Sequence, residues 1–323
     1  MTDHLSKIVV LDTGYEHYRY EKEVLARAGY TLHIFTGDPS DRRAKMDYAS
    51  AAAGVFVRWT RVDKTFLEHC RNLKAVVRYG TGYENIDLEA ATKTGVKVAN
   101  VGGYGNHSVS DHALSLIYAC IRGLFPGTAG LKVHFGKPPF ERIFELHRKT
   151  LGIIGLGRIG GTLAGKATAL FKRVLASDPY IPDSRFSELR VDKTSLESLL
   201  RESDVISIHC NLTGETTHLL DRQAFEAMER KPYVINTARG PVIKTAALLE
   251  ALVKGFIQGV GLDVFDSEIP EEIDERILSH PHIIATGHYA WYSENSMAEL
   301  QKRAAQNMVA LLAGRTIEDG LQS

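Results

Sequence analysis

Residues 151–178, LGIIGLGRIGGTLAGKATALFKRVLASD, place three glycines between a short apolar run and a helical pattern, and the segment closes on an acid. The leading LGII predicts a buried strand. Gly155, Gly157 and Gly160 have the spacing that gives a tight turn, a close backbone approach and close helix packing. The amides and the positive dipole at the start of the helix favour bound phosphates. This order predicts a dinucleotide-binding unit in which Asp178 accepts hydrogen bonds from ribose hydroxyls.

The acid at the end of this segment also bears on the choice of cofactor. A carboxylate at Asp178 would meet a 2′-phosphate with a like charge, so the sequence favours NAD over NADP. A GxGxxG string alone also occurs in ordinary glycine-rich turns. The strand before it, the helix after it and the acid after the next apolar run favour the dinucleotide interpretation.

The rest of the chain alternates short β-branched runs with helical patterns, which is typical of parallel sheets with crossover helices. One series of such runs lies within residues 7–100 and a second within residues 150–288. A length of 323 residues is typical of two domains. We therefore predict an α/β chain with two doubly wound parallel sheets. Ser293 is the expected N-cap of a last helix that ends near Ala313.

Composition narrows the class of partner. Lysine plus arginine equal aspartate plus glutamate at 39 each, so no excess charge favours nucleic acid or an anionic membrane. No apolar run approaches the length of a membrane span, and the opening MTDHLSKIVVLD lacks the apolar core of a signal peptide. Cys70, Cys120 and Cys210 are far apart and predict neither a disulfide framework nor a metal site. We expect a small-molecule partner and a cytoplasmic location, without nucleic acid or membrane.

Three side chains stand at the ends of apolar runs in the second series, where parallel sheets bind ligands. Arg239 follows YVINTA, Glu268 follows GVGLDVFDS and His288 ends IIATGH. Hydride transfer at a carbinol carbon requires a group that exchanges the hydroxyl proton near neutral pH, and histidine has a suitable pKa. A carboxylate orients such a ring, and an arginine clamps a substrate carboxylate or polarises its carbonyl. Together the three predict a dehydrogenase site.

Five segments in this order make the chain resemble the D-isomer-specific 2-hydroxyacid dehydrogenases: GLGRIG at 155–160, HCNLTGETTHLL at 209–220, VINTARGPVI at 234–243, GLDVFDSEIP at 261–270 and TGHYAWYSENS at 286–296. The string AWYSEN is similar to the branch that includes the C-terminal-binding proteins, which are NAD-binding corepressors, and related bacterial dehydrogenases. The resemblance implies a Rossmann NAD-binding domain at 104–289, inserted into a flavodoxin-like substrate domain formed by 1–103 and 290–323.

The resemblance also implies roles for individual residues. Arg239, Glu268 and His288 would be catalytic, and the amides of Thr81 and Gly82 would bind the substrate carboxylate together with Arg239. Trp291 would either line the substrate pocket or pack at a domain junction. The residues expected to bind the cofactor are Gly155, Gly157, Arg158, Ile159, Gly160, Asp178, Cys210, Thr216, Thr237, Ala238, Asp263 and His288.

The chain departs from the family pattern in three places. Gly287 replaces a proline before the histidine, Ile269 separates Glu268 from Pro270, and Lys244 replaces an acid. None of these changes removes a catalytic group, so they bear on the substrate and on the pose of the side chains.

We therefore predict an NAD-dependent enzyme that interconverts a small 2-keto acid and its D-2-hydroxy acid, and a homodimer that uses the apolar helix from Ser108 to Leu124. Two alternatives stay open: an NAD-sensing, corepressor-like binding protein, and a dehydrogenase of another small anion such as formate or phosphite. We interpret His107 and His112 as packing or hinge residues, and His209 as structural or cofactor-adjacent. The pattern does not specify which acid is the substrate.

Overall fold

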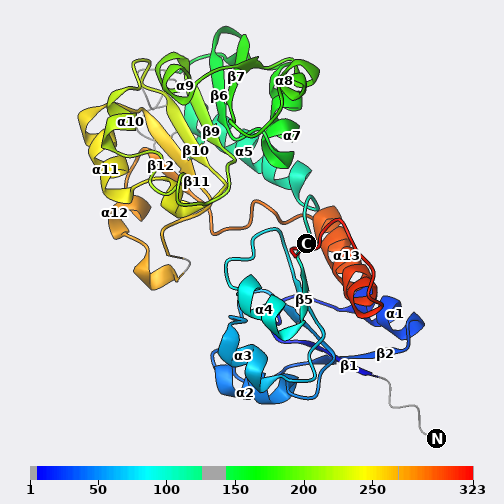
Figure 1. Cartoon of the computed structure of the whole chain (residues 1–323). Coiled ribbons are helices and arrows are strands. Elements are labelled where there is room, and N and C mark those ends of the chain that lie inside the picture. Colours follow the sequence, from blue (N-terminus) through cyan, green and yellow to red (C-terminus); the bar gives the residue numbers. More distant parts are fainter. Residues whose placement is uncertain (1–5, 126–142, 268, 323) are drawn as a thin grey trace, which may run out of the picture. The chain divides into compact units, whose positions relative to one another are not determined.

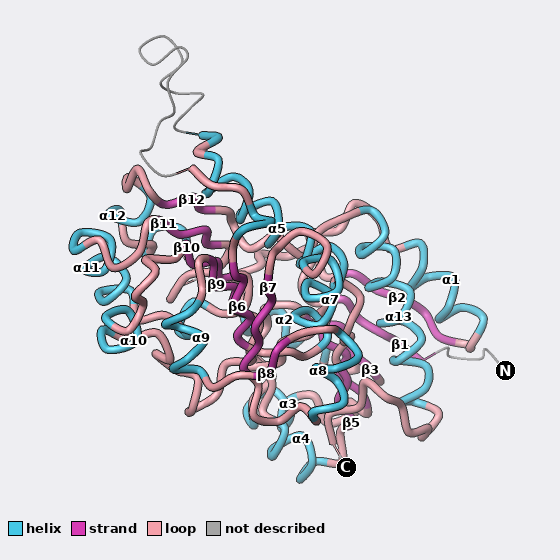
Figure 2. Tube along the Cα trace, turned by 90° about the horizontal axis from the view of Figure 1, so that it is seen from above, coloured by secondary structure: helices cyan, strands magenta, loops and turns pink. Residues whose placement is uncertain are grey.

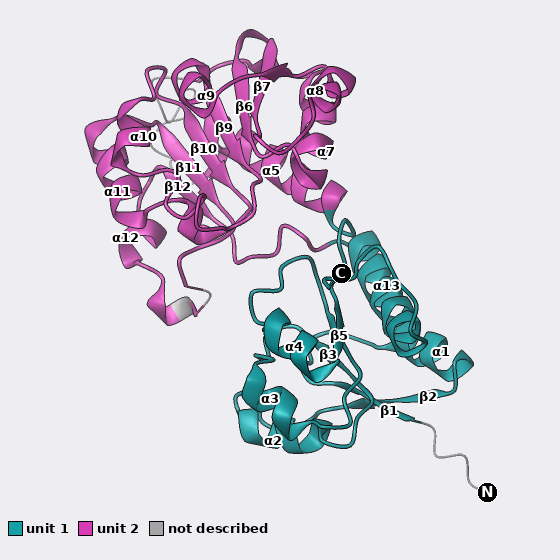
Figure 3. Ribbon diagram, in the orientation of Figure 1, with its two compact units in different colours: residues 1–105, 293–323 teal, residues 106–292 magenta. Residues whose placement is uncertain are grey.

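The computed structural model describes residues 6–125, 143–267 and 269–322, and the chain divides into two compact units (Figures 1 and 3). Unit 1 comprises Met1–Gly105 and Ser293–Ser323, and unit 2 comprises Asn106–Tyr292. Each unit contains one parallel sheet with helices on both faces, so the predicted doubly wound α/β class is confirmed.

The sheet of unit 1 has five parallel strands in the order β2-β1-β3-β4-β5, which is the flavodoxin-like order. Its strands are β1 (Ser6–Val10), β2 (Tyr30–Ile34), β3 (Gly54–Val57), β4 (Ala75–Arg78) and β5 (Lys97–Ala99). Its helices are α1 (Arg19–Arg27), α2 (Arg42–Ala49), α3 (Lys64–His69), α4 (Leu88–Thr94) and α13 (Glu294–Leu312).

Helices from both ends of the chain cover this sheet. Val9, Val55 and Val76 pack on one face with apolar residues of α2, α3 and α4. On the other face, α13 lies so close that a Cβ added to Gly54 would be 2.4 Å from the Sδ of Met308. Helix α1 packs beside α13 (Figure 1). The second segment of unit 1 is therefore part of the core that begins with β1.

The sheet of unit 2 has seven parallel strands in the order β12-β11-β10-β9-β6-β7-β8, which is the Rossmann order extended by one strand. Its strands are β6 (Thr150–Ile154), β7 (Arg173–Ser177), β8 (Asp192–Lys193), β9 (Val205–Ile208), β10 (Tyr233–Asn236), β11 (Gly259–Leu262) and β12 (Ile283–Ala285). Its helices are α5 (Asn106–Arg122), α7 (Arg158–Ala167), α8 (Asp183–Leu189), α9 (Leu196–Glu202), α10 (Arg222–Glu226), α11 (Thr245–Lys254) and α12 (Glu275–Leu278), with short 3-10 turns at Leu146–Arg148, Gly240–Val242 and Pro270–Glu272.

Successive residues of the central strands of unit 2 pack into two separate hydrophobic cores, one on each face of the sheet. Ile153 packs with α5, α7 and α8, whereas Ile154 packs with α9, α10 and α11. Figure 2 shows these two groups of helices on opposite sides of the strands. This alternation explains why the runs are apolar throughout, because both faces of a parallel sheet are covered.

The predicted last helix is confirmed, and Ser293 caps it in a reciprocal pair with Ser296. Strand β8 was not predicted, since it has only two residues. Within the described residues, no helix is long and apolar enough to cross a membrane.

Candidate cofactor and catalytic site

The three glycines after β6 have the three geometric uses that their spacing predicts. Gly155 has φ +89°, and a Cβ there would lie 2.6 Å from the backbone N of Cys210. A Cβ on Gly160 would lie 2.0 Å from the carbonyl O of Gly155, so the helix packs directly on the turn. At Gly157, no described atom lies within 4 Å of the Cβ position, which leaves the backbone open to a ligand.

This turn lies where the strand order of unit 2 reverses. Strands β6 and β9 are neighbours, and Gly155 follows one while Cys210 follows the other. Chains that leave such a pair diverge, and ligands of doubly wound sheets bind there. Gly157 begins α7 without a side-chain cap, and Arg158 and Ile159 form its first turn. The turn therefore presents open backbone and a helix N-terminus, which fit a pyrophosphate.

Asp178 follows β7 directly and supports the same turn. Its Oδ2 accepts a hydrogen bond from the N–H of Leu156 at 2.8 Å, and its Oδ1 accepts one from the N–H of Tyr180 at 3.0 Å. The side chain is half-buried. Each carboxylate oxygen keeps acceptor capacity beyond these bonds, which fits ribose hydroxyls.

The residues after β9 are largely engaged with one another. Burial raises the pKa of the Cys210 thiol to about 11, so it is not a thiolate. Burial lowers the pKa of His209 to about 4, so this ring is neutral, and its Nε2 lies 2.8 Å from the Oγ of Ser207. The hydroxyl of Thr216 accepts from the N–H of Thr213 and donates to the carbonyl of Asn211.

Arg239 leaves the end of β10 on a turn that Asn236 fixes. The Oδ1 of Asn236 accepts from the N–H of Ala238 at 3.0 Å, and its Nδ2 donates to the carbonyl of Arg239 at 2.9 Å. The guanidinium of Arg239 donates to the carbonyl of Ala238 at 2.8 Å. Thr237 is buried, and its hydroxyl bonds to no described residue. We did not predict the role of Asn236, although a polar residue at the end of an apolar run is a signal for it.

His288 lies beyond β12 in a backbone conformation that is rare for its residue type. Its φ is +54°, and such left-handed residues cost of order 1–3 kcal/mol and persist only where the surrounding structure imposes them. Its N–H donates to the carbonyl of Asp263 at 2.8 Å, and its carbonyl accepts from the indole N–H of Trp291 at 2.9 Å. Glu268, the predicted partner of this histidine, lies outside the described residues.

The carboxylate of Asp263 holds the segment that carries His288. It is 1% exposed and accepts from the hydroxyl of Thr286 at 2.6 Å and from the N–H groups of Tyr289 and Ala290 at 3.2 and 2.9 Å. The Nε2 of His112, on α5, lies 2.9 Å from the Oγ1 of Thr286 and 3.6 Å from the Oδ1 of Asp263. His112 thus packs against this loop, and cofactor binding by Asp263 stays a prediction.

Thr81 and Gly82, in unit 1, follow β4 after Gly80, whose φ is +121°. The side chain of Asn100 donates to the carbonyl of Thr81 at 2.6 Å, which fixes the loop. The N–H groups of Thr81 and Gly82 donate to no acceptor within the described part of the chain. Two adjacent backbone donors are therefore available for a carboxylate.

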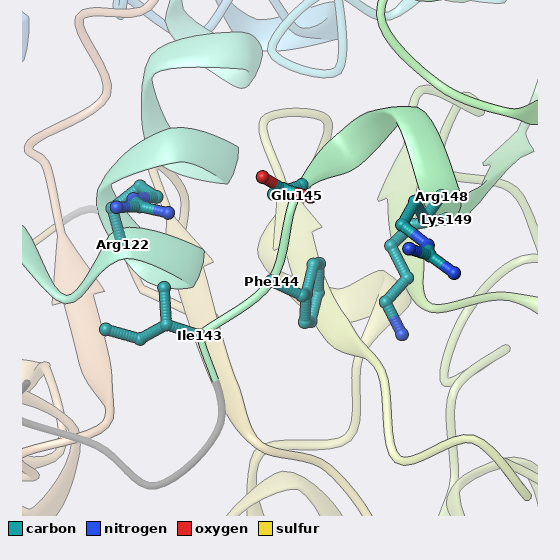
Figure 4. Close-up of a pocket in the computed structure, with 6 residues that line it drawn as sticks. All are labelled: Arg122, Ile143, Phe144, Glu145, Arg148 and Lys149. Carbon is teal, nitrogen blue, oxygen red and sulfur yellow. The ribbon is translucent and has the colours of Figure 1, made fainter.

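A hollow of about 520 Å³ is drawn in Figure 4 with the residues that line it. It lies at the opposite end of β6 from the glycine turn. Lys149 lines it and immediately precedes β6, whereas Gly155 immediately follows that strand. It is therefore separate from the predicted cofactor site. Nowhere in residues 6–125, 143–267 and 269–322 do three or more His, Cys, Asp or Glu side chains form a metal-binding group. The hollow is lined by Arg122, Ile143, Phe144, Glu145, Arg148 and Lys149.

The two sheets and the glycine turn define a two-domain, dinucleotide-binding α/β protein. Residues 114–290 match the family described as "D-isomer specific 2-hydroxyacid dehydrogenase, NAD binding domain". The chain belongs to the D-isomer-specific 2-hydroxyacid dehydrogenase family, and it is an NAD-dependent oxidoreductase of that family. The predicted family and the predicted cofactor are thereby confirmed.

Individual relatives differ in their substrates. The chain is 37% identical over 251 residues to a hydroxypyruvate reductase of Thermotoga maritima, covering 77% of this chain and 80% of the relative. It is 32% identical to a D-3-phosphoglycerate dehydrogenase of Mycobacterium leprae, covering 93% of this chain but 57% of that longer protein. The crystal structure of a D-lactate dehydrogenase from Aquifex aeolicus with NAD and lactic acid has a TM-score of 0.84, 29% identity and 96% coverage of both chains.

Proposed function

We propose that this protein interconverts a small 2-keto acid and its D-2-hydroxy acid, with unit 1 as the substrate domain and unit 2 as the NAD-binding domain. The observation that carries the proposal is the His288 loop. An ionisable residue has a costly backbone conformation in a loop that the buried Asp263 holds, at the carboxyl edge of the sheet that bears the glycine turn. Arg239 leaves the same edge.

Each residue has a defined task in this proposal. The N–H groups of Thr81 and Gly82 bind the substrate carboxylate, and Arg239 clamps it and polarises the carbonyl. When bound, NADH supplies the hydride that reduces the carbonyl carbon. His288 gives its proton to the carbonyl oxygen, and Glu268 orients the histidine ring. Trp291 serves as an apolar wall of the substrate pocket, with its indole N–H bonded to the carbonyl of His288 and its ring edge-to-face with Tyr292.

The experiment that tests this proposal is steady-state oxidation of NADH with glyoxylate, hydroxypyruvate, pyruvate and phenylpyruvate. We expect turnover of at least one of them, and we expect His288→Ala to lower kcat by about a hundred- to ten-thousandfold, the usual worth of a positioned proton donor. NADH binding, measured by fluorescence, should stay near that of the wild type in this variant. Tight NADH binding without turnover of any keto acid would instead favour the NAD-sensing alternative.

We further infer a homodimer located in the cytoplasm. The inference is supported by α5, which ends beside the exposed side chains of Leu124 and Phe125 and exposes Tyr118 on its length. The three cysteines are thiols rather than disulfides, which suits a reducing compartment. Light scattering on the purified chain tests the assembly, and a mass of one chain would contradict it.

A further inference from the structure

Unit 1 contains a buried carboxyl group that the proposed mechanism does not use. Glu21, on α1, is 0% exposed. Its Oε1 accepts a hydrogen bond from the hydroxyl of Tyr79 at 2.8 Å, and its Oε2 lies 3.4 Å from the Nε2 of Gln301 on α13. That Nε2 also donates to the carbonyl of His17 at 2.6 Å. One carboxyl group thus joins α1, α13 and the residue that follows β4.

Tyr79 connects this carboxyl group to the loop that we assign to the substrate carboxylate. Its ring stacks on Phe56 with centroids 5.1 Å apart, and its N–H donates to the carbonyl of Val57 at 2.8 Å. Gly80, Thr81 and Gly82 follow it directly. Phe56 and Val57 thus hold the ring and the backbone of Tyr79. The hydrogen bond from its hydroxyl to Glu21 adds a third contact at the point where the chain leaves β4.

The nearest positive charges do not bond to Glu21. The guanidinium of Arg78 donates to the carbonyl of Tyr79 at 2.6 Å, and that of Arg58 lies 5.7 Å from the ring centroid of Tyr15, which packs against Tyr79. Among the described residues, no lysine, arginine or histidine side chain pairs with it, from β2, from α13 or from the β4 end. The ionisable groups that face it are the phenols of Tyr79 and Tyr18, and burial raises the pKa of both, so they stay neutral. The hydroxyl of Tyr79 donates to Glu21, whereas that of Tyr18 bonds to no described residue. Burial also raises the pKa of Glu21 to about 7, so this group changes charge near neutrality.

We propose that Glu21 is a positioning residue for the loop Tyr79–Gly82, and that its charge sets the affinity of this loop for an anionic substrate. The inference rests on the proposed function. Both forms of the carboxyl group accept the hydrogen bond from Tyr79, so the loop keeps its place in either form. Ionisation adds one negative charge behind the loop while the charge of Arg78 beside it stays the same. The added charge repels a carboxylate bound on the Thr81 and Gly82 amides.

The test is KM for the keto acid and Kd for NADH as functions of pH, on both sides of pH 7. In the wild type, KM should rise about fivefold as the pH increases through this range, an effect of about 1 kcal/mol. Glu21→Gln keeps an acceptor and removes the charge, so its KM should stay at the low value throughout, with kcat and the Kd for NADH unchanged. Tyr79→Phe breaks the tie but keeps the charge, so KM should be higher at every pH while the pH step remains.

Glu23→Gln is the matched control, because Glu23 lies on the same helix, is exposed and pairs with Arg27 at 2.5 Å. It should reproduce the wild-type profile. An active wild type whose pH step persists in Glu21→Gln overturns the role of Glu21 and leaves the proposed function intact. A wild type that turns over no keto acid overturns the proposed function and this role with it.

Discussion

At the scale of single residues, the three hydrogen bonds accepted by Asp263 make the position of His288 depend on a side chain elsewhere. Asp263→Asn keeps the volume of the side chain, but the new amide N–H group would face the backbone N–H donors of the loop. We expect a loss of about 1.5–3 kcal/mol of unfolding free energy, the worth of one bond to a charged group, together with a lower kcat/KM. Urea unfolding and steady-state kinetics measure the two effects. Asp266→Asn, at an exposed neighbour that bonds to Thr245, is the control; equal kcat/KM in both variants would contradict the assignment.

The role of Asp178 is also best tested by replacement with asparagine. Replacement by alanine would also remove the acceptor for the Leu156 amide, so Asp178→Asn is the cleaner test of charge. Without the negative charge, a 2′-phosphate is no longer repelled, and the preference for NADH over NADPH should fall by about tenfold, measured as the ratio of kcat/KM values. Asp183→Asn, at an exposed acid that pairs with Lys193, should leave the ratio unchanged. An unaltered ratio in Asp178→Asn would remove Asp178 from the cofactor site.

At the scale of the element, α7 offers a matched pair of glycines. A Cβ on Gly160 would meet the carbonyl of Gly155 at 2.0 Å, whereas at Gly165 no described atom lies within 4 Å. Gly160→Ala should therefore lower Tm, through overpacking of about 1–3 kcal/mol, and weaken NADH binding. Gly165→Ala should raise stability by up to about 1 kcal/mol, because alanine favours helix. Thermal unfolding and NADH titration separate the two, and similar behaviour of both variants would show that the turn tolerates a side chain.

At the same scale, the existence of the strands could be predicted from the sequence, but the residues at which they end could not. The run YVINTA extends to Ala238, but β10 ends at Asn236. The N–H of Ala238 donates to the side chain of Asn236 and not to a neighbouring strand. Similarly, VISIHC extends to Cys210 while β9 ends at Ile208. Apolar periodicity continues into these turns because the turns are buried as well. The residues after the strands are those assigned to the site, so the boundary that periodicity misses is the functional one.

At the scale of the whole molecule, Glu21 makes stability depend on pH. Its pKa rises from 4.5 in the unfolded chain to about 7 in the fold. The folded protein therefore retains a proton that the unfolded chain loses, so the contribution is complete below pH 4.5 and is lost as the pH rises to about 7. The loss amounts to about 3 kcal/mol. Unfolding free energies at several pH values should show Glu21→Gln gaining on the wild type over this range, with Glu23→Gln parallel to the wild type. A constant difference would contradict the raised pKa.

The contacts that could not be predicted join residues that lie far apart in the sequence. The helical pattern puts Glu21 on the same face as the buried Leu25, so its burial had a local signal. Its partners Tyr79 and Gln301 lie 58 and 280 residues away, and no local pattern identifies them. The contact of His112 with the loop of Thr286 is of the same kind. In contrast, the contact of Gly155 with Gly160 joins near neighbours in the sequence, so this part of the glycine turn could be predicted, whereas the approach of Cys210 to Gly155 could not.

The course of the chain has a consequence for its synthesis on the ribosome. Residues 106–292 form a continuous unit and have all their sheet partners as soon as they emerge. The strands of unit 1 are completed later, because the face with Gly54 and Ile8 is fully covered only after α13, which carries Met308, has been synthesised. Leu321 and Gly320 then add backbone contacts along β5. Of the two units, the one that is translated first is therefore completed last, and until then part of its apolar face is open to aggregation.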